Sequence, residues 1–171
     1  GSLEKSLKDL DISLAEKMVK SAEGHIKILQ DLDFDLIKVS LKSSDVVTTI
    51  EAYKAFSEKY DYPLHIGLTE SGTLKGGLVK SSVGIGSLLS QGIGDTIRVS
   101  LTENPIEEVH AGYAILKALN LRQKGVNFVS CPTCGRTQID LIGLAKRVEE
   151  RFKDLDANIT IATMGCAVNG P

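Results

Sequence analysis

Strand-like runs recur along this chain at nearly constant intervals. Apolar runs rich in β-branched residues begin near positions 34, 64, 96 and 126, at residues 33–41, 63–69, 96–101 and 126–130. Parallel strands need a long crossover connection, usually a helix, and one such strand–helix unit takes about thirty residues. The repeat therefore predicts an α/β fold with a parallel sheet, either as a barrel or as an open doubly wound sheet.

Helices are predicted between these strands. Ser13 and Glu16 have the spacing of a capping box ahead of a helix of about five turns, Asp45 is placed to cap the next helix, and Asn104-Pro105 to open another. Apolar residues recur at helical spacing and are expected on one face of each helix. These are Leu14, Met18, Ala22, Ile26 and Leu29; Ile50, Tyr53 and Phe56; Val79, Val83, Gly84 and Leu88; and Ile106, Val109, Tyr113, Leu116 and Leu119.

Charge and hydropathy exclude some classes of partner. The net charge of −2 gives no support for nucleic-acid binding, and the scarcity of aromatic residues disfavours a base-stacking surface. No apolar run has the length of a membrane span, and the charged first twenty residues do not resemble a signal peptide. Three cysteines without a secretory signal favour a cytoplasmic location, where thiols stay reduced.

The three cysteines lie in the last quarter of the chain, each just after a strand-like run. Cys131 and Cys134 form a Cys-x-x-Cys turn, and Cys166 follows the strand predicted at 158–163. With the helix predicted at about 139–153, these strands form a βαβ unit, which brings both turns to the same end of the sheet. An iron–sulfur cluster or a zinc ion, a redox dithiol and simple buried cysteines remain open interpretations.

Polar residues follow each of the earlier strands. Ser40 and Lys42, Thr69 and Glu70, and Arg98 and Ser100 lie at or just beyond the carboxyl ends of their strands. Active sites of parallel α/β folds gather at that edge. Lys42 and Arg98 suit an anionic group, Ser100 can donate to a phosphate oxygen, and Glu70, beside a Gly-rich loop, is the acid/base candidate.

Ordinary structural roles compete with these assignments. Lysine or arginine at a strand end is commonly a solvated or salt-bridged residue. Arg98, inside an apolar strand, is expected to need a carboxylate or an anionic ligand. His65 is expected to be a hydrogen-bonded core histidine, and the glycines at 84, 86, 92 and 94 are expected to allow close packing instead of binding a dinucleotide.

Five segments in this order and spacing resemble the 4-hydroxy-3-methylbut-2-enyl diphosphate synthase family of the non-mevalonate isoprenoid pathway. They are IKVSLKSSD from Ile37, HIGLTE from His65, GIGDTIRVSL from Gly92, CPTC from Cys131 and GCAVNGP from Gly165. The resemblance covers essentially the whole chain. It implies the C-terminal part of a TIM-type (β/α) barrel in residues 1–122, followed by the start of a βαβ-type iron–sulfur domain in residues 123–171.

The resemblance also implies a reaction and its residues. The family reductively opens the ring of 2-C-methyl-D-erythritol 2,4-cyclodiphosphate and removes water, using a 4Fe-4S cluster and two electrons from ferredoxin or flavodoxin. Cys131, Cys134 and Cys166 then match cluster ligands, and Lys42, Arg98, Ser100 and Asn169 match substrate-binding positions. Glu70 matches a carboxylate near the reacting carbons, and a homodimer is expected.

The ends of the chain depart from the family pattern. The first element is a helix, and the glutamate that is the family's fourth cluster ligand would follow Pro171. The chain is therefore expected to be an internal fragment, inactive alone, with an open barrel edge that favours association with another copy. The alternative interpretation is a non-catalytic iron–sulfur or zinc-binding module on a half-barrel scaffold.

Overall fold

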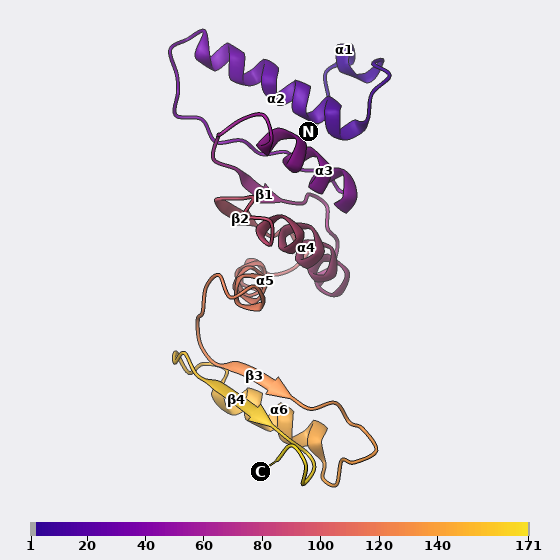
Figure 1. Cartoon of the computed structure of the whole chain (residues 1–171), viewed down its shortest axis with the longest axis vertical. Coiled ribbons are helices and arrows are strands. Elements are labelled where there is room, and N and C mark those ends of the chain that lie inside the picture. The colour runs from indigo at the N-terminus through magenta and orange to yellow at the C-terminus, as the bar shows by residue number, and fades with distance from the viewer. Residues whose placement is uncertain (1–2, 171) are drawn as a thin grey trace. The chain divides into compact units, whose positions relative to one another are not determined.

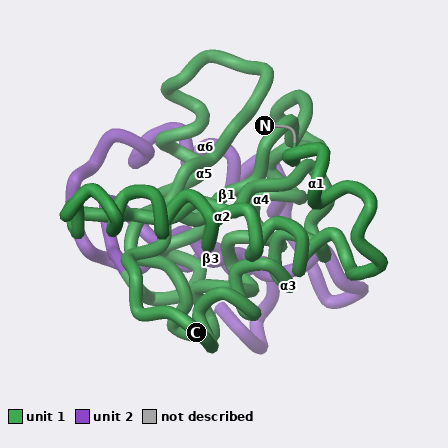
Figure 2. The backbone as a smooth tube through the Cα atoms, turned by 90° about the horizontal axis from the view of Figure 1, so that it is seen from above, with its two compact units in different colours: residues 1–121 green, residues 122–171 purple. Residues whose placement is uncertain are grey.

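The chain folds into two compact units. The computed structural model describes residues 3–170. Unit 1 comprises Gly1–Leu121 and unit 2 comprises Arg122–Pro171 (Figure 2). The division lies next to the boundary predicted between residues 122 and 123. Each unit is described by itself below.

Unit 1 alternates helices with short parallel strands (Figure 1). Its elements are α1 (Lys5–Lys8), α2 (Leu14–Gln30), α3 (Val46–Ser57), β1 (His65–Gly67), α4 (Leu74–Leu89), β2 (Thr96–Arg98) and α5 (Pro105–Ala118). β1 pairs with β2 in parallel, and a parallel bridge joins Val39 to Leu64. Strand segments that follow one another in sequence are therefore neighbours in the sheet, as in one wall of a parallel α/β fold. The predicted α/β class is confirmed.

The strands of unit 1 are shorter than predicted. The segment predicted as a strand over 33–41 contributes only the bridge at Val39, and β1 and β2 have three residues each. Side chains replace backbone partners here. The carbonyl oxygen of His65 accepts hydrogen bonds from Ser40 Oγ and from the Tyr53 hydroxyl, both at 2.7 Å. That carbonyl is where a longer ladder would continue, so side-chain bonds end the regular pairing early.

The helix starts follow the predicted caps. Ser13 and Glu16 form a complete capping box at the start of α2, with the Glu16 carboxylate accepting from the Ser13 backbone N–H at 2.9 Å. The Asp45 carboxylate accepts from the Thr48 N–H at 2.7 Å at the start of α3. Asn104 caps α5, with proline in its first turn. These predictions are confirmed because capping depends on residues adjacent in sequence.

The buried faces of α2, α4 and α5 match the predicted faces only in part. Ile26, Gly84 and Leu88 are buried as predicted, and Met18, Ala22, Leu29 and Leu119 pack against the core. Five residues predicted on the apolar faces of these helices are exposed instead: Leu14 in α2, Val79 and Val83 in α4, and Ile106 and Val109 in α5. The buried residues are Ala15, Val19 and Ile26 in α2; Gly77, Ser81, Gly84, Ile85 and Leu88 in α4; and Ala111, Gly112 and Ile115 in α5. In α4 and α5 more than half of them are glycine, alanine or serine. Consecutive helices also contact one another from α2 to α5, and α4 contacts β1. Small side chains let these neighbours approach closely.

Gly84 shows this packing directly. A Cβ atom at Gly84 would overlap the Leu68 Cδ1 atom, whereas a Cβ atom at Gly86 would meet nothing within 4 Å. The largest fully buried side chains of unit 1 include Tyr53, Phe56 and Ile66 beside these helices. The prediction that helix glycines permit close packing is therefore confirmed at Gly84 and wrong at Gly86.

Unit 2 is a βαβ unit, as predicted. It contains β3 (Asn127–Ser130), α6 (Leu141–Phe152) and β4 (Thr160–Thr163). The strands pair in parallel from Asn127↔Thr160 to Ser130↔Thr163. A further bond from the Cys131 N–H to the Thr163 carbonyl oxygen, 3.1 Å long, extends this pairing by one residue. The turns after β3 and β4 therefore begin side by side.

Within residues 3–170, none of the helices combines the length and the apolar character needed to cross a bilayer.

Candidate functional site

One side of the sheet in unit 1 is polar. Between the helix α2 and the helix α3, Ile37, Val39 and Leu41 are buried, while the residues that alternate with them are exposed or half-buried. Successive side chains of an extended strand point to opposite faces, so the two sets lie on opposite sides. The polar face, as we define it, consists of Lys38, Ser40 and Lys42, His65 of β1, Thr96 and Arg98 of β2, and Ser100 just after β2.

Contacts across the strands hold the polar face together. His65 is the Cα partner of Thr96, and its Nδ1 lies 2.8 Å from Thr96 Oγ1. The Arg98 guanidinium donates to Ser100 Oγ at 3.0 Å. Two of the predicted substrate-binding residues, Arg98 and Ser100, are therefore in direct contact.

The charges of this face have one sign. Burial, then Arg98 and then Lys38 lower the pKa of Lys42, which places these cations within electrostatic reach of one another. None of the three takes part in an ion pair with another described residue. Like charges gathered without ion-pair partners favour the binding of an anion.

Arg98 differs from its prediction in one respect. It was expected inside an apolar strand, where its charge would need a partner. In the structure its side chain lies on the exposed face of the sheet. The reason is the alternation of β2, in which Ile97 and Val99 face the helices and Arg98 does not. The guanidinium is therefore solvated without any carboxylate, and it is accessible to a ligand.

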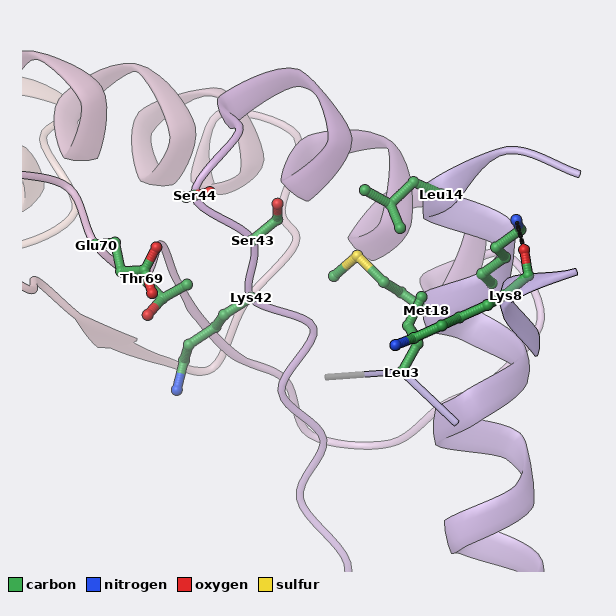
Figure 3. Close-up of a pocket in the computed structure, with 10 residues that line it drawn as sticks. Leu3, Lys8, Leu14, Met18, Lys42, Ser43, Ser44, Thr69 and Glu70 are labelled. Atoms are coloured by element: carbon green, nitrogen blue, oxygen red, sulfur yellow. Dashed lines mark hydrogen bonds between the residues drawn. The ribbon is translucent and has the colours of Figure 1, made fainter. Parts of the chain in front are cut away.

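Glu70 follows β1 and lines an open pocket with Lys42. The pocket has a volume of about 510 Å³. Figure 3 shows Glu70, Thr69, Lys42, Ser43 and Ser44 on one side of it and Leu14, Met18, Leu3 and Lys8 on the other. The Glu70 backbone has a φ of 54°, in the left-handed region that non-glycine residues rarely adopt. Glu70 thus lies beside one of the site's cations, in an unusual backbone conformation.

The three cysteines of unit 2 lie on turns that follow β3 and β4. All are free thiols, with Cys131 and Cys166 half-buried and Cys134 exposed. The two turns touch, because the Gln138 N–H donates to the Gly165 carbonyl oxygen at 2.8 Å. Among residues 3–170, however, they do not converge into a ready-made group that could hold a metal ion. Their joint role as metal ligands stays a prediction.

The surroundings of these thiols suit thiolate chemistry. The backbone N–H of Arg136, followed by the Arg136 side chain, holds the pKa of the Cys134 thiol below its usual value. The thiolate is the form that binds metal. Cys131 Sγ lies 3.1 Å from Met164 Sδ and accepts from the Asn169 amide at 3.3 Å. Three cysteine thiols on adjacent turns fit an iron–sulfur cluster by the chemistry of their donor atoms.

The predicted site residues are divided between the two units. Lys42, Glu70, Arg98 and Ser100 belong to unit 1, and the cysteines and Asn169 belong to unit 2. Within unit 1, Lys38, His65 and Thr96 share the polar face although they were not predicted as site residues. The sequence pattern that could have placed them there is the strict alternation of polar and apolar residues in Lys38-Val39-Ser40 and Thr96-Ile97-Arg98.

Comparisons with known proteins agree with the division of the chain. Residues 1–113 match the family described as the GcpE TIM-barrel domain, and residues 127–171 match the GcpE protein C-terminal domain. The first match covers most of unit 1, and it favours the barrel over the open doubly wound sheet.

Curated relatives match the whole chain. It is 59% identical over 172 residues to a protein of Geobacter sulfurreducens and 62% identical over 171 residues to one of Dehalococcoides mccartyi. A protein of Clostridium tetani is 59% identical over 172 residues. All three are named 4-hydroxy-3-methylbut-2-en-1-yl diphosphate synthase (flavodoxin). Each match covers 100% of this chain and 49% of the relative, so the chain spans about half the length of these relatives.

Proposed function

Because the chain belongs to the GcpE family, we propose that it forms part of a 4-hydroxy-3-methylbut-2-enyl diphosphate synthase. In this proposal unit 1 supplies a wall of the substrate barrel and unit 2 the start of the iron–sulfur domain. The substrate is 2-C-methyl-D-erythritol 2,4-cyclodiphosphate, which is reductively opened and dehydrated in isoprenoid biosynthesis. The cationic polar face of unit 1 is the observation that carries the proposal.

The polar face matches the chemistry of a diphosphate. Lys42 and Arg98 supply positive charge and form no ion pair with a carboxylate of the described residues, and Ser100 lies in hydrogen-bond contact with Arg98. Guanidinium binds phosphate oxygens in a bidentate manner, while ammonium acts as a point charge. In this proposal the two cations hold the substrate by its phosphates, and the Ser100 hydroxyl adds a hydrogen bond.

Glu70 is proposed to donate the proton that the departing hydroxyl takes up. Loss of water requires that a departing hydroxyl take up a proton as its carbon–oxygen bond breaks. The Glu70 carboxyl group lines the same pocket as Lys42, next to the place where the phosphates would bind. A proton held on a Glu70 oxygen would leave with that hydroxyl.

Cys131, Cys134 and Cys166 are the residues that would hold a 4Fe-4S cluster. Such a cluster supplies the electrons of a reductive step when it is bound. The chain's own contribution is to keep Cys134 ready as a thiolate and to hold Asn169 beside Cys131. We assign Asn169 to the substrate because it matches a substrate-binding position of the family, on the same turn as Cys166.

Further assignments follow from the family. The names of the relatives specify flavodoxin, so the proposed electron donor is flavodoxin, with ferredoxin as the other carrier of this chemistry. A cytoplasmic location suits three free cysteines. A homodimer is proposed as the active assembly.

Anaerobic reconstitution with iron and sulfide tests the cluster assignment. We expect iron, acid-labile sulfide and a broad absorption band at about 400 nm, as iron–sulfur proteins show. Cys131→Ser, Cys134→Ser and Cys166→Ser are each expected to lose most of that band. Bound zinc without sulfide would instead favour a non-catalytic metal-binding module, and a colourless protein would count against the cluster.

Calorimetric titration with the cyclic diphosphate tests the substrate assignment. Arg98→Gln and Lys42→Gln are expected to weaken binding by about tenfold to a hundredfold each, since a charge-assisted hydrogen bond contributes about 1.5–3 kcal/mol. Lys20→Gln, an exposed lysine of α2, is the matched control and should bind like the wild type. Equal weakening by all three variants would show that the polar face is not the site.

A further inference from the structure

His65 is the central residue of the polar face. It lies on β1, with the segment carrying Ser40 on one side and β2 on the other. Ser40 Oγ donates to the His65 carbonyl oxygen, and Thr96 Oγ1 contacts the imidazole Nδ1. The sequence had suggested a core histidine, but the residue is half-buried on the side that the cations share. The imidazole is therefore a member of the anion site by position.

One ring nitrogen of His65 has no hydrogen-bond partner among residues 3–170. Nδ1 is engaged by Thr96 at 2.8 Å, and Nε2 forms no hydrogen bond or ion pair with any described residue. The other two histidines differ, because each lies beside a carboxylate: His25 near Glu4 at 3.9 Å and His110 near Glu107 at 3.6 Å. His65 instead lies within electrostatic reach of Lys42, Lys38 and Arg98.

The charges around His65 oppose its protonation in the free protein. Burial, followed by Lys42, Lys38 and Arg98, lowers the pKa of the imidazole. The carboxylate of Asp95, which precedes Thr96, accepts a hydrogen bond from the Leu64 N–H at 2.7 Å. From α3 the Tyr53 hydroxyl donates to the carbonyl oxygen of His65, and the buried residues of α4 are not ionisable. A bound anion would reverse the balance of charge.

We propose that His65 is a further ligand-binding residue of this site, which takes up a proton as a diphosphate binds and donates a hydrogen bond to it through Nε2. The inference rests on the proposed function, because it takes the polar face as the place where the diphosphate binds. The proton comes from solvent, and no covalent bond changes. Binding and protonation are then linked, so each strengthens the other.

The sign of the pH dependence follows from this linkage. Anion binding raises the pKa of His65 from its lowered value, so the complex binds one proton more than the free protein in the interval between the two pKa values. Within that interval the affinity falls as pH rises, by up to about tenfold per pH unit for one proton. Above the interval the imidazole is neutral in both states, and its contribution is constant.

Proton NMR of the three histidines, with inorganic pyrophosphate as the probe, tests the proposal directly. We expect saturating pyrophosphate to raise the pKa of His65 by at least about one unit, a tenfold change in proton affinity. His25 and His110 are expected to shift much less. A His65 pKa unchanged by bound pyrophosphate would overturn the proposal even if no variant could be made.

Variants give the second measurement. His65→Gln keeps a hydrogen-bonding side chain but cannot be protonated, and His110→Gln is the matched control on α5. Comparing each variant with the wild type at the same pH cancels the protonation of pyrophosphate itself. The expected loss in affinity for His65→Gln grows from little at high pH to about tenfold or more at low pH.

The outcomes separate the two proposals. In one outcome, pyrophosphate binding depends on Arg98, but the affinity ratio of the wild type to His65→Gln is the same at every pH. That outcome would overturn the role of His65 and leave the anion site intact. Failure of pyrophosphate to bind, or binding unaffected by Arg98→Gln, would overturn both.

Discussion

At the scale of single residues, α4 uses glycine in two ways. Gly84 faces Leu68, which is only 1% exposed, so the helix reaches its neighbour because a side chain is missing. Gly86, two residues later, has open space where its Cβ would be. The same residue type therefore serves packing at one position and has no packing role at the other.

Alanine substitution is expected to have opposite effects at these positions. Gly86→Ala should stabilise the protein by up to about 1 kcal/mol, the difference in helix propensity between the two residues. Gly84→Ala should destabilise it by about 1–2 kcal/mol, because the overlap with Leu68 outweighs the gain in propensity. Urea unfolding of both variants measures the difference, and equal stabilisation by both would contradict the packing described for Gly84.

Single residues were only partly predictable from the sequence. Arg98, Ser100, Lys42 and Glu70 stand out because a polar residue at the end of an apolar strand is conspicuous. His65 does not, since a histidine within a strand looks the same whether it faces helices or solvent. The face of the sheet on which His65 lies depends on how its strand pairs with the neighbouring segment, and a single sequence does not reveal that register.

At the scale of elements, the junction between the Ser40 segment and β1 is held by side chains. The His65 carbonyl oxygen accepts from both Ser40 Oγ and the Tyr53 hydroxyl, each at 2.7 Å. This shared acceptor ties α3, the Ser40 segment and β1 together. The capped helix starts were predictable because they are local, whereas this junction joins residues far apart in sequence.

A double-mutant cycle should detect the shared acceptor. Tyr53→Phe and Ser40→Ala are each expected to cost about 0.5–1.5 kcal/mol, since the other donor still satisfies the carbonyl. The double variant leaves a partly buried carbonyl without either partner, so its loss should exceed the sum by about 1 kcal/mol. Strict additivity in urea unfolding would show that the two hydrogen bonds act independently.

The Tyr53 hydroxyl also predicts a dependence on pH. Burial raises the pKa of Tyr53 to about 12, above its unfolded value near 10. The folded state thus favours the neutral phenol, and this stabilisation is complete below about pH 10 and is lost as pH rises through about 12. Unfolding experiments across this range should show a smaller loss for Tyr53→Phe than for the wild type, and parallel curves would refute the prediction.

The faces of α4 and α5 show where prediction by hydrophobic pattern fails in part. Large apolar residues such as Val79, Val83 and Val109 are exposed, while Gly77, Ser81 and Ala111 are buried. Patterns of hydrophobicity weight large side chains, but helices in close contact select small ones. Packing distance, which is set by the neighbouring elements, decided these faces.

At the scale of the whole molecule, the chain is two units joined by a short exposed segment. Residues 122–124 are exposed and lie outside helices and strands. The thirty-residue repeat and the position of the cysteines were enough to predict a parallel α/β unit followed by a βαβ unit. The number of strand residues was not predictable, because side-chain donors ended the pairing.

Limited proteolysis should distinguish the two units. Trypsin at low concentration is expected to cut first after Arg122 or Lys124, because cleavage requires exposed chain outside regular structure. Mass spectrometry should then find an early fragment ending at one of these residues. Replacing both with glutamine is the control and should delay that cut, and first cleavage within α3 or α4 would contradict the division.

The φ of 54° at Glu70 has a consequence for any attempt to make this protein more heat-resistant. A left-handed backbone costs an ordinary residue roughly 1–2 kcal/mol that glycine does not incur. Selection for robustness alone would therefore replace Glu70 with glycine, and under the proposed function that exchange would remove the proton carrier. Under the proposed function, this single dihedral angle would thus set heat resistance against reactivity.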